Sequence, residues 1–60
     1  MEGMVGLQGR VVKPLTPTGV VLIKGENWKA TCLNGDIEVD ENMEVVRLEG
    51  LMLMVKRQNT

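Results

Sequence analysis

Apolar and polar residues alternate along much of the chain with a period of two, the spacing of a β-strand that buries one face. The pattern predicts strands over residues 7–13, 20–23, 26–32, 43–49 and 51–56. Residues 36–40 also alternate and predict either a short edge strand or an extended connection. Glycine, proline and asparagine separate these segments, so short turns are expected between the strands.

The residues between strands indicate how neighbouring strands are joined. Lys24-Gly25 is a two-residue connection and predicts an antiparallel hairpin. Asn34-Gly35 is a dipeptide typical of a type I′ turn. Gly9 permits a bend or bulge in the first strand, and the alternation slips at Val45-Val46, where we predict a bulge.

Trp28 is the only aromatic residue of the chain. In an extended segment it shares one face with Ala30 and Cys32. A tryptophan buries a large apolar area, and its indole N–H needs one hydrogen-bond partner. We therefore predict that Trp28 is the core anchor of the domain and does not stack on a ligand.

Five short antiparallel strands leave exposed edges in a flat sheet, and closure into a barrel removes those edges. The predicted fold is therefore all-β, a small five-stranded barrel. Periodicity alone leaves two architectures open, an OB-like Greek-key barrel and an SH3-like barrel. Residues 1–5 are expected to form a flexible lead-in and residues 57–60 a frayed tail.

Composition argues against catalysis and metal binding. The 60 residues form one domain at most and contain no histidine, serine or tyrosine, so common nucleophile and base pairs are missing. Cys32 is the only cysteine, which excludes an internal disulfide and a Cys/His zinc site. The acidic residues of positions 36–44 lack the EF-hand pattern and are interpreted as a solvated edge. We predict no catalytic residue, no metal ligand and no cofactor.

Four motifs, in order and at compatible spacing, resemble the C-terminal soluble domain of NfeD-like proteins. They are GRVV at residues 9–12, LTPTGVV at 15–21, GENWKA at 25–30 and MEVVRLEGLMLMV at 43–55. The resemblance covers residues 6–56. The chain departs from the family where a glycine commonly precedes the fourth strand, since Asp40 or Glu41 stands there.

The resemblance implies an OB-fold barrel over residues 6–56 that acts as an interaction module. It implies a partner among the stomatin- and flotillin-type (SPFH) membrane proteins, whose genes often neighbour those of the family. It also implies a soluble, cytoplasmic domain that reaches the membrane through a transmembrane segment outside this chain. Longer members carry a serine protease domain, which nothing in this chain matches.

Met52 and Met54 share one face of the fifth predicted strand, while Leu51, Leu53 and Val55 share the other. We interpret the methionines as an adaptable partner-binding patch. They could instead fill a satellite core or be covered by a neighbouring segment of a longer protein. Homo-oligomerisation is also open.

The alternative function is that of a small OB-fold module that binds single-stranded nucleic acid. Such modules combine a basic groove with aromatic platforms. This chain has a net charge of −1, one tryptophan, and seven basic residues spread along the sequence. Nucleic acid is therefore not an expected partner unless several basic residues converge on one face.

Overall fold

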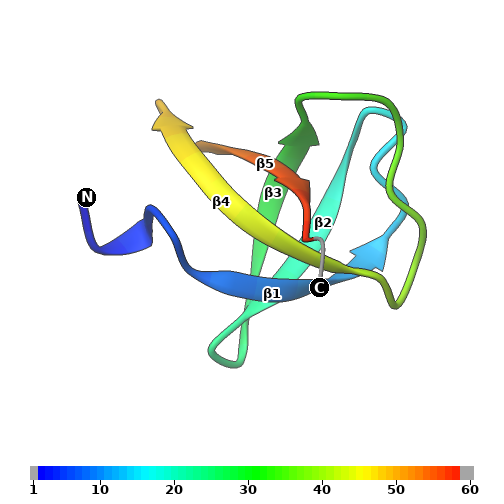
Figure 1. Ribbon diagram of the computed structural model, residues 1–60. Coiled ribbons are helices and arrows are strands. Elements are labelled where there is room, and N and C mark those ends of the chain that lie inside the picture. Colours follow the sequence, from blue (N-terminus) through cyan, green and yellow to red (C-terminus); the bar gives the residue numbers. More distant parts are fainter. Residues whose placement is uncertain (1, 59–60) are drawn as a thin grey trace.

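Five β-strands and one short 3₁₀ helix make up the computed structural model, which describes residues 2–58 (Figure 1). The elements are η1 Glu2–Met4, β1 Gln8–Lys13, β2 Thr18–Ile23, β3 Glu26–Cys32, β4 Asn42–Glu49 and β5 Met52–Arg57. Every predicted strand is present, with ends that agree to within two residues.

The strands close into a barrel in the order β1-β2-β3-β5-β4. β3 and β5 run parallel and pair through residues Ala30–Cys32 and Leu53–Val55, whereas the other neighbouring strands are antiparallel. Pairing between strands that are not consecutive in the chain is the Greek-key feature of an OB-type barrel. The predicted five-stranded Greek-key barrel is therefore confirmed.

The interior is filled by aliphatic side chains from all five strands and from two loops. Its buried residues are Val11, Leu15, Val21, Ile23, Ala30, Cys32, Ile37, Met43, Val45, Leu53 and Val55. Trp28 packs against this cluster from a half-buried position on β3, next to the fully buried Ala30 and Cys32 of the same strand. Trp28 thus borders the core, and aliphatic residues occupy its centre.

The turns differ in how they match the sequence. Lys24 and Gly25 both have positive φ, 51° and 81°, so the β2–β3 hairpin carries the expected two-residue turn. At Asn34-Gly35 only Gly35 has positive φ, at 73°, and the predicted type I′ turn is wrong because that turn needs two such residues. The chain continues instead into an extended connection.

Residues 33–41 form that connection between β3 and β4. Ile37 pairs with Leu15 in an isolated antiparallel bridge, and both side chains are fully buried. Asp40, one of the two residues at which the family resemblance leads us to expect a glycine, adopts a positive φ of 75° just before β4. Ile37 therefore closes one side of the core from a loop.

Two irregularities interrupt the sheet. The register between β4 and β5 shifts between Val45 and Arg47, which confirms the predicted bulge. The register between β1 and β2 shifts between Val11 and Lys13, so the bulge expected at Gly9 lies further along β1. Gly9 has a different role, discussed below.

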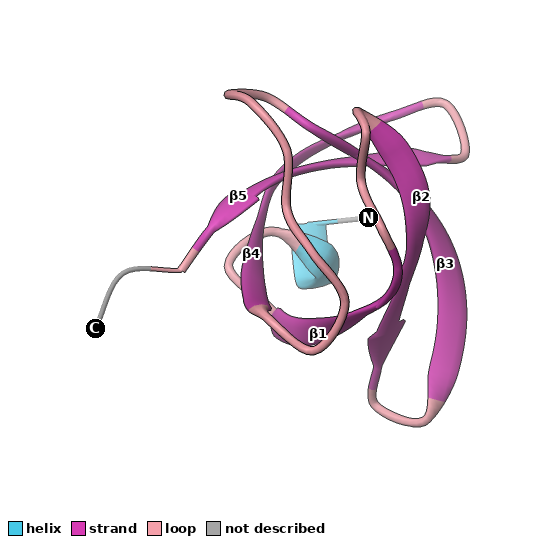
Figure 2. Cartoon of the chain, turned by 90° about the vertical axis from the view of Figure 1, so that its right-hand side faces the viewer, coloured by secondary structure: helices cyan, strands magenta, loops and turns pink. Residues whose placement is uncertain are grey.

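Parts of the predicted lead-in and tail belong to regular secondary structure. The predicted lead-in contains η1, and Figure 2 shows η1 near the middle of the barrel viewed end-on. Met4 packs against the core, and the N–H of Gly6 donates to the carbonyl oxygen of Val45 at 2.9 Å. Arg57, expected in the frayed tail, belongs to β5. Residues 1, 59 and 60 of the predicted lead-in and tail lie outside the described residues.

Candidate partner-binding surfaces

β5 separates its side chains cleanly between the interior and the outer surface. Leu53 and Val55 are completely buried, whereas Met52 and Met54 are half-buried on the opposite, outward side. Leu51, predicted to share the face of Leu53 and Val55, lies instead in the β4–β5 turn and is 90% exposed. The strand alternation therefore starts at Met52 and leaves the two methionines outside the core.

Polar groups flank these methionines on both neighbouring strands. Met54 lies opposite Arg47 of β4 and Thr31 of β3, and Met52 lies opposite Glu49. The Nε of Arg47 donates to Oε2 of Glu49 at 2.6 Å, and the Thr31 hydroxyl is hydrogen-bonded to a hydroxyl of β2 at 2.9 Å. We call these five residues the methionine face. Its apolar centre and polar rim match the anatomy of many protein interfaces.

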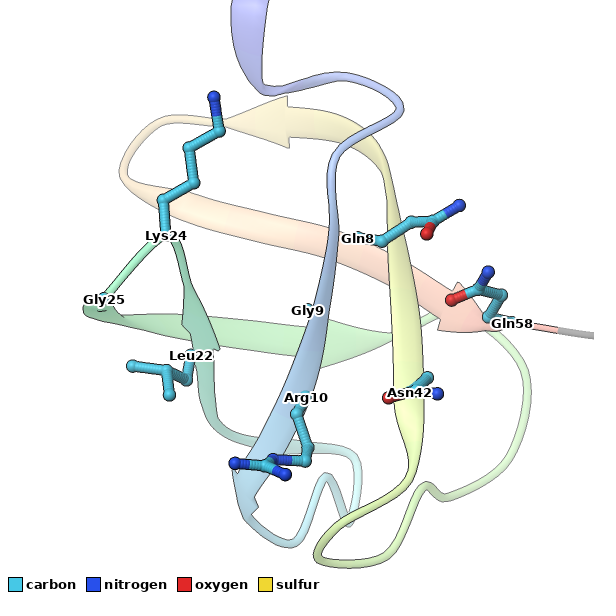
Figure 3. Close-up of a pocket in the computed structure, with 8 residues that line it drawn as sticks. All are labelled: Gln8, Gly9, Arg10, Leu22, Lys24, Gly25, Asn42 and Gln58. Carbon is cyan, nitrogen blue, oxygen red and sulfur yellow. The ribbon is translucent and has the colours of Figure 1, made fainter.

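A second candidate surface is a shallow hollow of about 400 Å³ that runs across β1 (Figure 3). Gly9 lies in its middle, and Figure 3 shows Leu22 and Lys24 on one side of β1 and Asn42 and Gln58 on the other. Its lining consists of Gln8, Gly9, Arg10, Leu22, Lys24, Gly25, Asn42 and Gln58. We call it the polar hollow.

Four of the seven basic residues are divided between the polar hollow and ion pairs outside it. Arg10 and Lys24 line the polar hollow, while Arg47 and Arg57 make ion pairs with Glu49 and Glu41 elsewhere on the barrel. The single tryptophan packs against the core and does not line the hollow. In the part of the chain that the structure describes, the polar hollow therefore joins two cations with no aromatic side chain, whereas single-strand binders combine a basic groove with aromatic platforms.

Cys32 and Glu41 both form contacts that support the fold. Cys32 is buried, and its thiol donates to the carbonyl oxygen of Asn34 at 3.2 Å. Glu41 pairs with Arg57 at 2.6 Å and accepts a hydrogen bond from the N–H of Glu38 at 3.1 Å. Within residues 2–58, no three cysteine or acidic side chains gather as a metal site would require. Over the same residues, no helix has the length and apolarity needed to cross a membrane.

The barrel fold and the sequence together identify the class of the chain. A family model described as the NfeD-like C-terminal, partner-binding domain matches residues 1–57. The chain therefore belongs to this family, and the resemblance inferred from the four motifs is confirmed.

Individual relatives agree with this assignment. The chain is 47% identical over 58 residues to the membrane-bound protease PH1510 of Pyrococcus horikoshii, a match that covers 95% of this chain and 13% of the protease. It superposes with a TM-score of 0.94 on the C-terminal domain of stomatin operon partner protein 1510-C from Pyrococcus horikoshii, at 45% identity and with 98% of this chain and 94% of that chain covered.

A more distant structure shares the fold. It is the soluble domain of a membrane protein implicated in regulation of membrane protease activity from Corynebacterium glutamicum, with a TM-score of 0.87, 20% identity and 97% of both chains covered. At this identity the likeness concerns the fold alone. Since the chain spans only 13% of the length of PH1510, the activity of that protease does not transfer to it.

The polar hollow is the feature that sequence reasoning missed. Its residues come from β1, β2, the β2–β3 turn, the start of β4 and the position directly after β5. No spacing in the sequence relates these segments. Only the strand order, which places β1 between β2 and β4, brings their side chains together.

Proposed function

We propose that this domain is a non-catalytic module that binds a stomatin- or flotillin-type (SPFH) membrane protein. In this proposal it acts in the cytoplasm as one domain of a longer, membrane-bound protein and helps to organise its partner there. The match of residues 1–57 to a partner-binding domain family supports the binding role. The name of the 1510-C relative, a stomatin operon partner, supports the class of partner.

The methionine face is the proposed contact surface, and its geometry is the observation that carries this choice. Met52 and Met54 project from β5 on the side away from the core, and neither is covered completely. Their long thioether side chains adapt to irregular partner surfaces. The surrounding ion pair and hydroxyls can remain hydrated at the rim while the methionine centre is dehydrated on binding.

A binding titration tests this proposal directly. The purified chain is titrated against the SPFH protein of the same organism, reconstituted in vesicles, with the Met54→Lys variant in parallel. A buried charge in the centre of an interface is expected to weaken binding about tenfold or more, since central hot-spot residues contribute roughly 2 kcal/mol.

Val39→Lys is the matched control, because Val39 is 44% exposed and lies in the loop before β4, outside the methionine face. Its binding should equal that of the original chain, and thermal unfolding must show that both variants are folded. Equal binding by the folded Met54→Lys variant would place the contact elsewhere. No binding by the original chain would reject the SPFH partner itself.

A further inference from the structure

The polar hollow carries two cationic side chains and no carboxylate. Arg10 contributes from β1 and Lys24 from the β2–β3 turn, and the rest of the lining is amide, glycine and leucine. This composition contrasts with the chain as a whole, which has a net charge of −1. Within residues 2–58, neither cation takes part in an ion pair, unlike Arg47 and Arg57. The hollow is therefore a local site of positive charge.

Lys24 adopts a backbone conformation that is unfavourable for lysine. Its φ of 51° lies in the left-handed region, where a two-residue hairpin turn favours asparagine or glycine. A lysine in this position keeps a cation at the rim of the hollow although other residues suit the turn better. Backbone strain of this kind is a common property of functional sites.

Three amide side chains complete the lining, those of Gln8, Asn42 and Gln58. The N–H of Gln58 donates to the carbonyl oxygen of Asn42 at 3.1 Å, which holds Gln58 beside the start of β4. An amide side chain both donates and accepts hydrogen bonds, as a peptide group does. A phosphate group, in contrast, only accepts hydrogen bonds and would use the amide N–H groups but not the amide oxygens.

We propose that the polar hollow binds an extended, acidic segment of a protein, with its carboxylates at Arg10 and Lys24 and its main chain at the amides. The hollow uses no residue of the methionine face, so this site is additional to the contact proposed above. A peptide that crosses β1 at Gly9 reaches both sides of the hollow, because position 9 faces the interior and leaves no side chain between Gln8 and Arg10 on the outer surface.

The probe is a short blocked peptide of alternating glutamate and serine, titrated into the isotope-labelled chain and followed by amide chemical shifts. Shifts are expected at the lining residues, including the side-chain amides, and a glutamine-serine peptide should produce none. Arg10→Gln and Lys24→Asn should each weaken binding about threefold, and the double variant about tenfold. Lys24→Asn is also expected to raise the melting temperature, so its weaker binding cannot come from lost folding.

Lys13→Gln with Lys29→Gln is the matched control, since both lysines are exposed, lie outside the hollow and change the net charge equally. An effect of this control as large as that of the double variant would overturn the proposal in favour of diffuse charge. Shifts confined to other surfaces would also overturn it.

Binding to phosphatidylserine vesicles with the same dependence on Arg10 and Lys24, and none to the acidic peptide, would assign the hollow to lipid headgroups instead. Met54→Lys should leave peptide binding unchanged, which separates this test from that of the SPFH contact.

Discussion

Gly9 occupies a position on β1 where a side chain has no room. A Cβ atom built there would lie 2.7 Å from Cγ1 of Ile23 and 3.2 Å from Sδ of Met43, and it would collide with the carbonyl oxygen of Leu22. The missing side chain faces the interior, because Ile23 and Met43 are buried. Gly9 thus lets β1 approach β2 closely and closes the barrel wall beneath the polar hollow.

Replacing Gly9 with alanine should therefore destabilise the domain. The added methyl group must displace backbone atoms of β2, and overpacking of this kind costs about 1–3 kcal/mol. Gly3→Ala is the control, since no atom lies within 4 Å of its Cβ position and its φ is not positive. Urea unfolding followed by Trp28 fluorescence measures both changes. Equal stabilities for the two variants would contradict the close-packing explanation.

At the scale of elements, the connection between β3 and β4 works as a part of the barrel wall. Ile37 pairs with Leu15, the N–H of Asp40 donates to the carbonyl oxygen of Val11, and Arg57 donates to the carbonyl oxygen of Asp36. These bonds fix an otherwise irregular segment over an open side of the core. The alternation of residues 36–40 already indicated an extended segment with one apolar side.

Ile37→Ala should consequently lower stability as a core substitution does. Its side chain is completely buried, and truncation of a buried isoleucine costs about 2–5 kcal/mol. That is a large part of the total stability of a domain, roughly 5–15 kcal/mol. Val39→Ala in the same connection should change it by less than about 0.5 kcal/mol, because Val39 is 44% exposed. Calorimetric unfolding of the two variants would show whether Ile37 has this role.

At the scale of the whole molecule, the predictions that succeeded rested mostly on local signals, although the local signal at Asn34-Gly35 led to a wrong turn type. Strand positions, the Lys24-Gly25 hairpin and the bulge near Val45 all follow from alternation and turn residues. The parallel pairing of β3 with β5 has no local signal, and the OB-type arrangement was reached through the resemblance to a family. The half-buried position of Trp28 and the exposure of Leu51 depend on how the strands are arranged in the closed barrel, which no local pattern encodes. The polar hollow depends on the same long-range arrangement.

The charge distribution of the whole barrel leads to a last prediction, which concerns the alternative function. Two of the seven basic residues line the polar hollow, and two others are neutralised by ion pairs. Each contact with a phosphate makes nucleic-acid binding more dependent on salt. Bases add affinity by stacking on aromatic side chains. Trp28 is engaged with the core and is not a free platform.

Titration with a single-stranded oligonucleotide should therefore leave the fluorescence of Trp28 unchanged at physiological salt. Any weak response at low salt should disappear as salt is added and should not depend on the base sequence. Arg10→Gln is the control variant, because it removes one of the two cations of the polar hollow that could contact a phosphate. A saturable response at physiological salt that Arg10→Gln abolishes would make the hollow a nucleic-acid site. Its two cations and its amide N–H groups would then bind phosphates, and the amide oxygens would remain with water.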